Sequence, residues 1–466
     1  MSRNPNSSMF IPIIVSTMMK RIIAVLSFIS LVACSHVEED HNGSLDQSEQ
    51  NPEQQKENNT SGSEQPSSEE TVLDIPVFSP DTEAIIEGVS LTSEQELLQL
   101  SANRFAFHLL LQMYEDHSFV FSPFSLQIAL SMALNGAEGE TAEEMFRVLG
   151  YDSTDFILLN TYAKSLLEQL PVVDASARVR MADAIIVNED YHLLPDFQTL
   201  MSTYYYAPIV NLPFHDEVAV KDAINEWCTN STDGAISKLL DRVSPAAIMY
   251  LLNALYFNAE WYRPFDEEFQ ILHNQPFYLG NGEVLVDYLV SGEDLMYAEN
   301  DSFQLVTRPL GIKGSYELAI LLPGESSSIA SVLETIQETG WKDICMMQKP
   351  TFLQLEFPKF QIESSFELVD VLRRMGMKRA FGEGAQFTKM VSEGVPFITS
   401  VLQKSIISID ESGVEAATAT LIEMADTDSG EDETEPVLFH ANHPFIYMII
   451  EKTSGTILLA GVYDGK

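Results

Sequence analysis

The residues between Gly413 and Glu435 have types and a spacing that suit a chemical event at an exposed peptide bond. From residue 414 to residue 425 the side chains alternate between two sets, and both glutamates, Glu415 and Glu423, fall in the same set. A period of two is typical of a strand with one buried face. Residues 426–435 follow at once and are all small polar or acidic, which predicts exposure to solvent. The pattern therefore predicts a strand-forming segment that continues into a loop open to attack by a protease. The alternative is an ordinary strand and turn.

Other kinds of chemistry have little support in the chain. The sequence contains no CxxC, HExxH, GxGxxG, GxxxxGK[ST] or GxSxG pattern, so it implies no cofactor, no catalytic metal and no nucleophile motif of a hydrolase. The acids around Asp426 and Asp428 have the density of a calcium loop but lack the glutamate spacing and flanking helices of an EF-hand. We predict that the protein is not an enzyme and that it binds no metal.

Composition narrows the choice of partners. The chain has 466 residues, of which 45% are hydrophobic, enough for a large core. It carries 69 acidic against 26 basic side chains, a formal charge of -43, which disfavours binding to nucleic acid and to an anionic membrane surface. Of the three cysteines, Cys228 and Cys345 lie far apart and Cys34 lies near the N-terminus. We therefore expect no disulfide framework.

Residues 1–33 read as a signal peptide. A basic pair, Lys20-Arg21, precedes an apolar run that ends in Leu-Val-Ala-Cys at Cys34. This ending resembles the lipobox of bacterial lipoproteins, in which the cysteine is lipidated. The alternatives are an ordinary cleaved signal and a short membrane anchor, but the run is short for a span. Translation is also compatible with a start at Met18 or Met19.

Residues 34–75 read as a disordered tether, because they are rich in Ser, Glu, Gln and Asn and nearly free of large apolar side chains. An acidic cluster at residues 38–40 resembles the surface-export signals of some bacterial lipoproteins, although a solvated linker has the same composition. We expect attachment to a bacterial outer membrane through the lipid alone, on the cell surface. The alternative is secretion.

Helical and strand patterns interleave from residue 76 to residue 466 without a second linker, which predicts one α+β domain. Apolar residues recur at helical spacing over residues 97–114 and 127–134. Strands are predicted over residues 246–257, 317–322, 352–357, 406–409 and 445–451.

Several motifs, in order along the chain, resemble those of the serpin family. The hinge resemblance comprises Glu411, Gly413, Val414, Glu415, Ala416, Ala417, Thr418, Ala419 and Thr420. Further matches are residues 121–125, 224–227, 252–261, 357–360, 375–377 and 439–445. Together they span about residues 100 to 463. The chain is accordingly identified as resembling a serpin of the bacterial lipoprotein type.

The resemblance implies a serpin fold with three β-sheets, eight to nine helices and an exposed reactive-centre loop at about residues 411–436. It also implies a suicide inhibitor, in which a protease cleaves the loop, forms a covalent acyl-enzyme and is displaced as the hinge enters the central sheet. Gly413 is expected to give the backbone its freedom to bend. A monomer is expected. The rival class is a non-inhibitory serpin-fold binding protein, but the hinge residues are small, as insertion requires.

The reactive bond is expected within a window that follows the hinge. The family's usual distance from the hinge glycine implies a bond between Thr427 and Asp428, whereas counting back from Pro444 implies a later one. Thr427 would suit an elastase-like protease. Cleavage after Asp426, by an enzyme that prefers acidic residues, is the second reading. The absence of Lys and Arg between Gly413 and Glu435 disfavours trypsin-like targets. The whole window comprises Met424, Ala425, Asp426, Thr427, Asp428, Ser429 and Gly430.

The same resemblance assigns structural roles beneath the opening sheet. Trp261 is expected to be a buried aromatic at the breach, where the hinge would enter. Ser122, Ser125 and Asn253 are expected to be polar groups of the shutter, satisfied by hydrogen bonds. Gln403 stands where many relatives carry histidine, a departure that leaves the strength of the shutter open. No helix rich in lysine and arginine suggests a heparin site.

Overall fold

The computed structural model describes residues 86–151, 155–245, 247–391, 393–394, 396–414 and 436–466. The described residues all belong to one compact unit. The expected signal peptide, Cys34 and tether lie outside the described residues, as does the loop 415–435. From residue 86 onward, no helix of the described segments combines the length and the apolar character needed to cross a bilayer.

Nine α-helices occur in the described parts of the chain, and side-chain caps explain several of their starts. Thr92 and Gln95 form a capping box at α1, and Ser122 caps α2 immediately before Pro123. The predicted helices over residues 97–114 and 127–134 are thereby confirmed. The helices are α1 Ser93–Met113, α2 Pro123–Gly136, α3 Gly139–Val148, α4 Phe156–Gln169, α5 Pro195–Leu200, α6 Glu217–Ser231, α7 Ile329–Thr339, α8 Trp341–Met346 and α9 Val369–Met375.

Six strands form the sheet that contains the hinge. Their order is β10-β11-β12-β4-β2-β3, in which only β2 and β3 are parallel neighbours. The bounds are β2 Arg178–Asn188, β3 Ile209–Leu212, β4 Met249–Glu260, β10 Phe360–Glu367, β11 Leu402–Ile409 and β12 Gly413–Val414. The very short β12 therefore lies between two long strands.

Nine further strands form a second sheet with two portions that β6 joins. One portion has the order β1-β15-β14-β8-β7, and the other contains β5, β6, β9 and β13. The three expected sheets thus correspond to the six-stranded sheet and these two portions. The bounds are β1 Phe119–Phe121, β5 Ile271–Leu279, β6 Gly282–Glu299, β7 Phe303–Leu310, β8 Tyr316–Pro323, β9 Lys349–Pro358, β13 Val437–His440, β14 Phe445–Glu451 and β15 Ile457–Tyr463.

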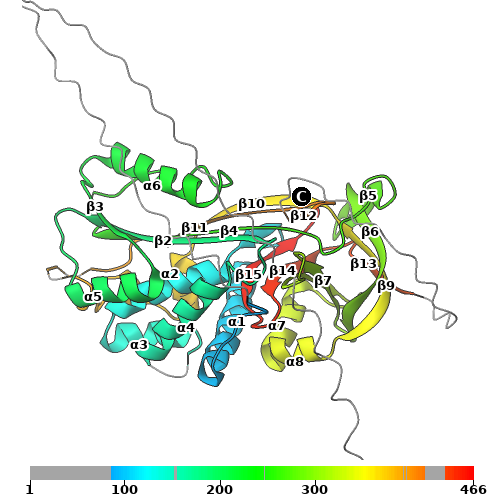
Figure 1. The fold of residues 1–466 in the computed structure, drawn as a ribbon, viewed down its shortest axis with the longest axis horizontal. Helices are drawn as coiled ribbons and strands as arrows, with labels where there is room; N and C mark the ends of the chain where they lie inside the picture. Colours follow the sequence, from blue (N-terminus) through cyan, green and yellow to red (C-terminus); the bar gives the residue numbers. More distant parts are fainter. Residues whose placement is uncertain (1–85, 152–154, 246, 392, 395, 415–435) are drawn as a thin grey trace, which may run out of the picture. The chain divides into compact units, whose positions relative to one another are not determined.

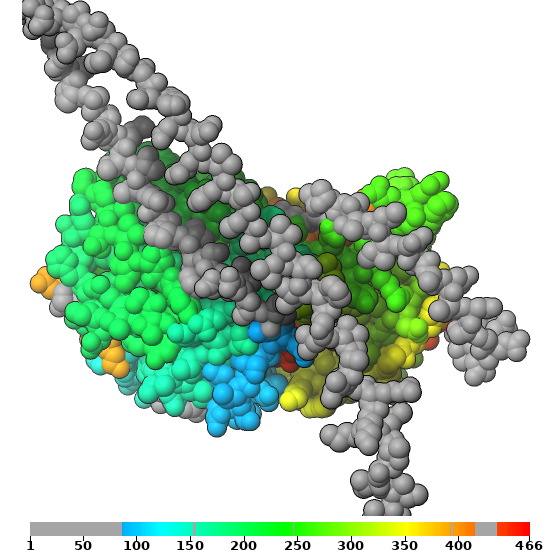
Figure 2. Space-filling view, viewed as in Figure 1, coloured from blue at the N-terminus to red at the C-terminus, as the bar shows by residue number. Residues whose placement is uncertain are grey.

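The six-stranded sheet has helices on both faces, with α2, α4 and α5 on one side and α6 alone on the other (Figure 1). The first face belongs to the main hydrophobic core, together with both portions of the second sheet. The second face packs against α6 in a separate, smaller apolar cluster. The hairpin of β5 and β6 projects at the right of the molecule (Figure 2). The α+β class is confirmed.

Candidate functional site

The described part of the hinge is already seated as a strand of the six-stranded sheet. Gly413 pairs with Glu260 on β4, and Val414 lies between Ala259 on β4 and Ile409 on β11. The side chain of Val414 is 1% exposed. Because opposite residues of an antiparallel pair point to the same face, Val414 shares the core face with Ile409. β12 therefore forms the first rungs of a strand that would run between β4 and β11.

Gly413 is required here for a reason other than the expected freedom to bend. Its backbone is not in the left-handed region. A Cβ atom at this position would lie 2.3 Å from the carbonyl oxygen of Ala259 and 2.7 Å from the Cα of Glu260. Gly413 allows the hinge backbone to approach β4 closely, and its expected freedom to bend during insertion stays a prediction.

Trp261 directly follows β4 and is hydrogen-bonded to the turn that precedes β12. Its indole nitrogen donates to the carbonyl of Asp410 at 2.7 Å, and its backbone N–H donates to the carbonyl of Ser412 at 3.0 Å. The guanidinium of Arg308 stacks on Trp261, 4.5 Å from the ring centroid, and pairs with the buried carboxylate of Glu293 at 2.9 Å. A buried charge therefore supports the indole that holds the hinge.

Glu411 is held by an ion pair with Lys359, which precedes β10. Burial opposes ionisation of Glu411, but the hydrogen bond and charge of Lys359 outweigh it and keep the pKa of Glu411 below its ordinary value. The backbone N–H of Phe265 donates to the carbonyl of Glu411 at 3.0 Å. Glu411 is thus held by contacts with two segments that are distant from it in the sequence.

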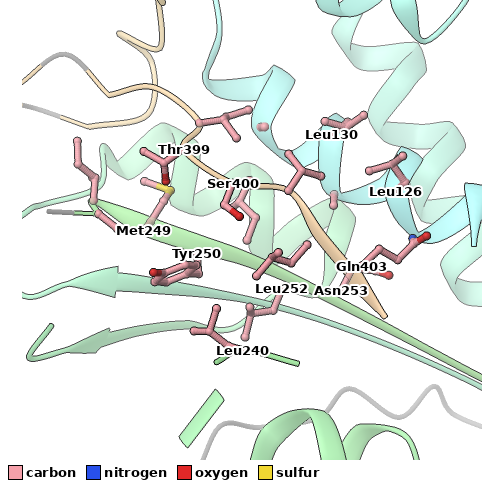
Figure 3. Close-up of a pocket in the computed structure, with 18 of the residues that line it drawn as sticks. Leu126, Leu130, Leu240, Met249, Tyr250, Leu252, Asn253, Thr399, Ser400 and Gln403 are labelled. Carbon is pink, nitrogen blue, oxygen red and sulfur yellow. The ribbon is translucent and has the colours of Figure 1, made fainter. Parts of the chain in front are cut away.

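Beyond Val414, strands β4 and β11 are joined by no backbone ladder in the described structure, since each pairs only with β12 on this side. We call the space between them the slot. A cavity of about 170 Å³ occupies its far half. Leu126 and Leu130 of α2 line one wall, while Leu240 lies on the opposite side (Figure 3).

Gln403 lies on the core side of the slot and holds the start of α2. Its amide oxygen accepts from the backbone N–H of Ser122 at 3.0 Å, and its amide nitrogen donates to the carbonyl of Ser122 at 2.8 Å. The hydroxyl of Ser122 donates to the carbonyl of Leu458 at 2.7 Å and accepts from the N–H of Ser125. Gln403 therefore provides a two-point attachment between the start of β11 and the start of α2.

Contrary to expectation, two other polar groups of the shutter lack hydrogen-bond partners among the described residues. The hydroxyl oxygen of Ser125 and the amide oxygen of Asn253 are buried without a hydrogen-bond partner among the described residues. Both residues line the cavity in the slot. Asn253 does donate to the carboxylate of Asp183 at 2.7 Å. Burial raises the pKa of Asp183 to about 7, although the Asn253 amide favours the ionised form.

The structure brings together Gly413, Val414 and Trp261 at one end of the slot, and Ser122, Ser125, Asn253 and Gln403 farther along it. The hinge from Glu415 to Thr420 and the window from Met424 to Gly430 lie outside the described residues. Sequence reasoning missed Lys359, Asp183 and Arg308 as parts of the site. Lys359 lies inside the serpin-like motif 357–360, but no local signal marks its pairing with Glu411.

The described residues offer neither a metal site nor a disulfide. No group of three His, Cys, Asp or Glu side chains in this part of the chain could hold a metal ion. Cys228 and Cys345 are both free thiols. Burial raises the pKa of Cys228 to about 11 and that of Cys345 to about 12, so both thiols stay protonated near neutral pH.

A family model described as serpin (serine protease inhibitor) matches residues 100–464. The chain belongs to the serpin family. A serpin-like protein of Thermococcus kodakarensis is 32% identical over 366 residues, which cover 77% of this chain and 83% of the relative. Intracellular coagulation inhibitor 2 of Tachypleus tridentatus is 29% identical and covers 78% of this serpin and 90% of its own length. Since serpins are generally protease inhibitors and not catalysts, the prediction that the protein is not an enzyme is confirmed.

Solved serpin structures share the fold. The native state of the thermophilic serpin tengpin has a TM-score of 0.71 at 26% identity, covering 82% of this serpin and 96% of tengpin. Thyroxine-binding globulin in complex with thyroxine has a TM-score of 0.69 at 22% identity, covering 79% and 98%. The second likeness concerns the fold alone.

Proposed function

We propose that this serpin inhibits a serine protease by a suicide mechanism. The protease serine attacks the carbonyl carbon of Thr427, the bond to Asp428 breaks, and the new amino terminus of Asp428 leaves. The segment up to Thr427 is then joined to the protease as an ester. Insertion of the hinge into the slot carries the acyl-enzyme away and distorts it before water hydrolyses the ester. The observation that carries the proposal is β12, which starts a strand inside a slot that is open beyond it.

The register of β12 supports insertion along the whole slot. Continuing the two observed antiparallel pairings by six residues places Thr420 opposite both Asn253 on β4 and Gln403 on β11. Its hydroxyl would then lie on the core face, where Asn253 offers an unpaired amide oxygen and Ser125 an unpaired hydroxyl. An arriving donor would satisfy groups that are costly to leave buried and unpaired.

The length of the slot also agrees with the expected reactive bond. The same register pairs Met424 with Met249, the first residue of β4. Residues 415–424 would therefore fill the slot, and Thr427 would emerge just past its end. The protease attached to Thr427 would be drawn to the far end of the slot, beside the first residue of β4.

An elastase-like protease is the proposed target, because a small residue such as Thr427 suits a small apolar specificity pocket. Cleavage after Asp426 by a protease that prefers acidic residues is the second reading. The acids that flank the window would repel proteases with acidic clefts.

The test is to incubate the purified chain with elastase-like, chymotrypsin-like, subtilisin-like, papain-like and Asp-preferring proteases. Denaturing electrophoresis and mass spectrometry then detect a covalent complex and locate the cut. The substitution Thr420→Glu should abolish the complex while cleavage continues, because a charge would enter the core face of the slot without a partner. Ile157→Glu is the control, since Ile157 on α4 is 72% exposed.

A complex that survives denaturant would support the proposal. Cleavage without a complex, and without a gain in thermal stability, would overturn it and leave a non-inhibitory binding protein. A complex formed equally well by the Thr420→Glu variant would show that the hinge does not need to enter the slot.

We also propose that Cys34 carries the lipid that holds the serpin, as a monomer, at the surface of a bacterial outer membrane. The support is the sequence of residues 20–34 and the acidic tether that follows. Metabolic labelling with a fatty acid should mark the wild-type chain and not a Cys34→Ala variant. Equal labelling of both chains would refute the anchor, and removal of the wild-type protein by external protease would establish its surface location.

A further inference from the structure

The outer side of the slot is covered by the segment that follows α6, residues 232–245, which we call the cover. Its apolar side chains Ile236, Leu240 and Val243 are each at most 5% exposed. Thr232, Ala235 and Ile236 face residues of both β4 and β11 across a small cavity. A strand that enters between β4 and β11 must therefore pass beneath the cover.

Hydrogen bonds join the cover to α6. The side-chain oxygen of Asn225 on α6 accepts from the backbone N–H groups of Leu239 and Leu240, each at 2.8 Å. The hydroxyl of Thr232 accepts from the N–H of Ile236 at 3.0 Å, and Gly234 donates to the carbonyl of Thr229 at 2.8 Å. Cover and helix are thus one unit that rests on the sheet.

Asp233 ties this unit to the sheet. One carboxylate oxygen lies 3.0 Å from Arg178 and the other lies 2.6 Å from Arg180, both on β2. Asp233 has a φ of 52°, the left-handed conformation that Asp and Asn tolerate better than most residues. Its side chain is 25% exposed, against 61% for Arg178 and 44% for Arg180. We call these three residues the clip.

The clip lies where insertion would have to begin. Arg178 is paired across the sheet with Asn258, and Arg180 with Tyr256. Asn258 directly precedes Ala259, which already pairs with Val414. The next rungs of an inserting strand would therefore form at the positions of β4 that lie beside the clip.

We propose that the clip formed by Asp233 with Arg178 and Arg180 is a kinetic gate that sets how fast a strand can enter the slot. This inference rests on the proposed inhibitory function. The cover must lift for the strand to pass, and lifting it breaks both ion pairs. Since the cover can settle back onto the outer face afterwards, the clip is present before and after insertion. It therefore acts on the rate of insertion and leaves its free energy unchanged.

The gate matters because insertion competes with hydrolysis of the acyl-enzyme. A slower insertion lets more protease escape, so more inhibitor molecules are consumed for each protease trapped. The same gate delays insertion of the uncut loop, which would exhaust the inhibitor before it meets a protease. The clip would set the balance between these two losses.

The test uses the full-length chain and a fluorescent synthetic peptide with the sequence of residues 415–424, which should enter the slot beyond Val414 without any protease. The variants are Asp233→Asn, which keeps the turn, and the double variant Arg178→Gln/Arg180→Gln. Lys164→Gln is the control, because its ion pair with Glu168 lies within α4 at 3.8 Å. Peptide uptake is followed by fluorescence anisotropy, and the stability of the complex by thermal unfolding.

Both clip variants should take up the peptide about three to ten times faster than the wild type, as expected for the loss of two partly exposed ion pairs. The gain in unfolding temperature on binding should match that of the wild type. Raising NaCl from about 0.02 M to about 0.5 M should speed uptake by the wild type more than uptake by the variants, because salt weakens the clip only in the wild type but weakens the repulsion between the acidic peptide and the acidic chain in all of them.

Three outcomes would count against the gate. If both variants take up the peptide at the wild-type rate, the clip is not a kinetic gate. The proposed inhibitory function would be unaffected by that result. Faster uptake with a matching loss in final stability would show that the clip is a general stabilising contact. A wild-type chain that neither takes up the peptide nor traps a protease would remove the proposed function, and the gate with it.

Discussion

At the scale of single residues, the hinge is seated by close fit and by charge. Val414 is buried between Ala259 and Ile409, and Glu411 is neutralised by Lys359. The alternation of residues 414–425 allowed the buried face of Val414 to be predicted from sequence. Trp261 was expected at the breach from the family resemblance alone. The pairing of Lys359 with Glu411 could not be predicted, because the two residues are distant in sequence and their contact depends on how the sheet is assembled.

Gly413→Ala should destabilise the hinge, because the added methyl would lie 2.3 Å from the carbonyl oxygen of Ala259. We expect β12 to leave β4 and the free energy of unfolding to fall by about 1–3 kcal/mol. Thermal unfolding measures the change. Gly280→Ala is the matched control, since a methyl group added there would meet no heavy atom within 4 Å. Equal unfolding temperatures for the two variants would contradict the close-approach role.

At the scale of elements, β2 and β4 place a carboxyl and an amide opposite each other beneath the slot. Asp183 and Asn253 are paired across the two strands and hydrogen-bonded at 2.7 Å. Asp183 is 5% exposed, and no described basic side chain forms an ion pair with it. Folding consequently favours the protonated form of the Asp183 carboxyl over the ionised form, relative to the unfolded chain.

This preference predicts a pH dependence of stability. The pKa of Asp183 rises from its ordinary value of 3.8 to about 7 on folding, so the native state binds the extra proton between these values. Its favourable contribution is complete at acid pH and is lost as pH rises through about 7. Asp183→Asn should therefore be more stable than the wild type at pH 8, by about 2–4 kcal/mol.

Guanidinium unfolding at about pH 5 and about pH 8 checks this prediction. The difference between the wild type and Asp183→Asn should grow with pH. The control is Asp370→Asn on α9, whose side chain is 83% exposed. A difference that is constant with pH would show that Asp183 does not hold a proton in the native state.

Elements with a strong local signal were predictable from sequence. The apolar spacing around Phe105 and the Ser122-Pro123 start predicted α1 and α2, and strands β4, β8, β9, β11 and β14 overlap their predicted ranges. The separation of β4 from β11 was implied only by family resemblance. Both strands have ordinary strand sequences, and the pairing of Gly413 and Val414 between them depends on contacts made more than 140 residues apart in the chain.

At the scale of the whole molecule, the charge of -43 is the dominant long-range property. It should speed encounters with cationic proteases and slow encounters with acidic ones. We expect the association rate with a basic target protease to fall about tenfold between about 0.02 M and about 0.5 M NaCl. Stopped-flow inhibition kinetics at several salt concentrations test this. An association rate that is independent of salt would show that charge does not guide the encounter.

The two ends of the reactive loop belong to different sheets, with β12 in the six-stranded sheet and β13 on β9 in the other. The part of the chain that follows the reactive bond contains β14 and β15, and all residues of these two strands are buried. A single cut therefore leaves two polypeptides that stay folded together and separate only in denaturant. The cut cannot be resealed, so each molecule keeps a permanent record of one encounter. In a population of this protein, the cleaved fraction would therefore record the number of encounters with protease, whether each protease was trapped or released.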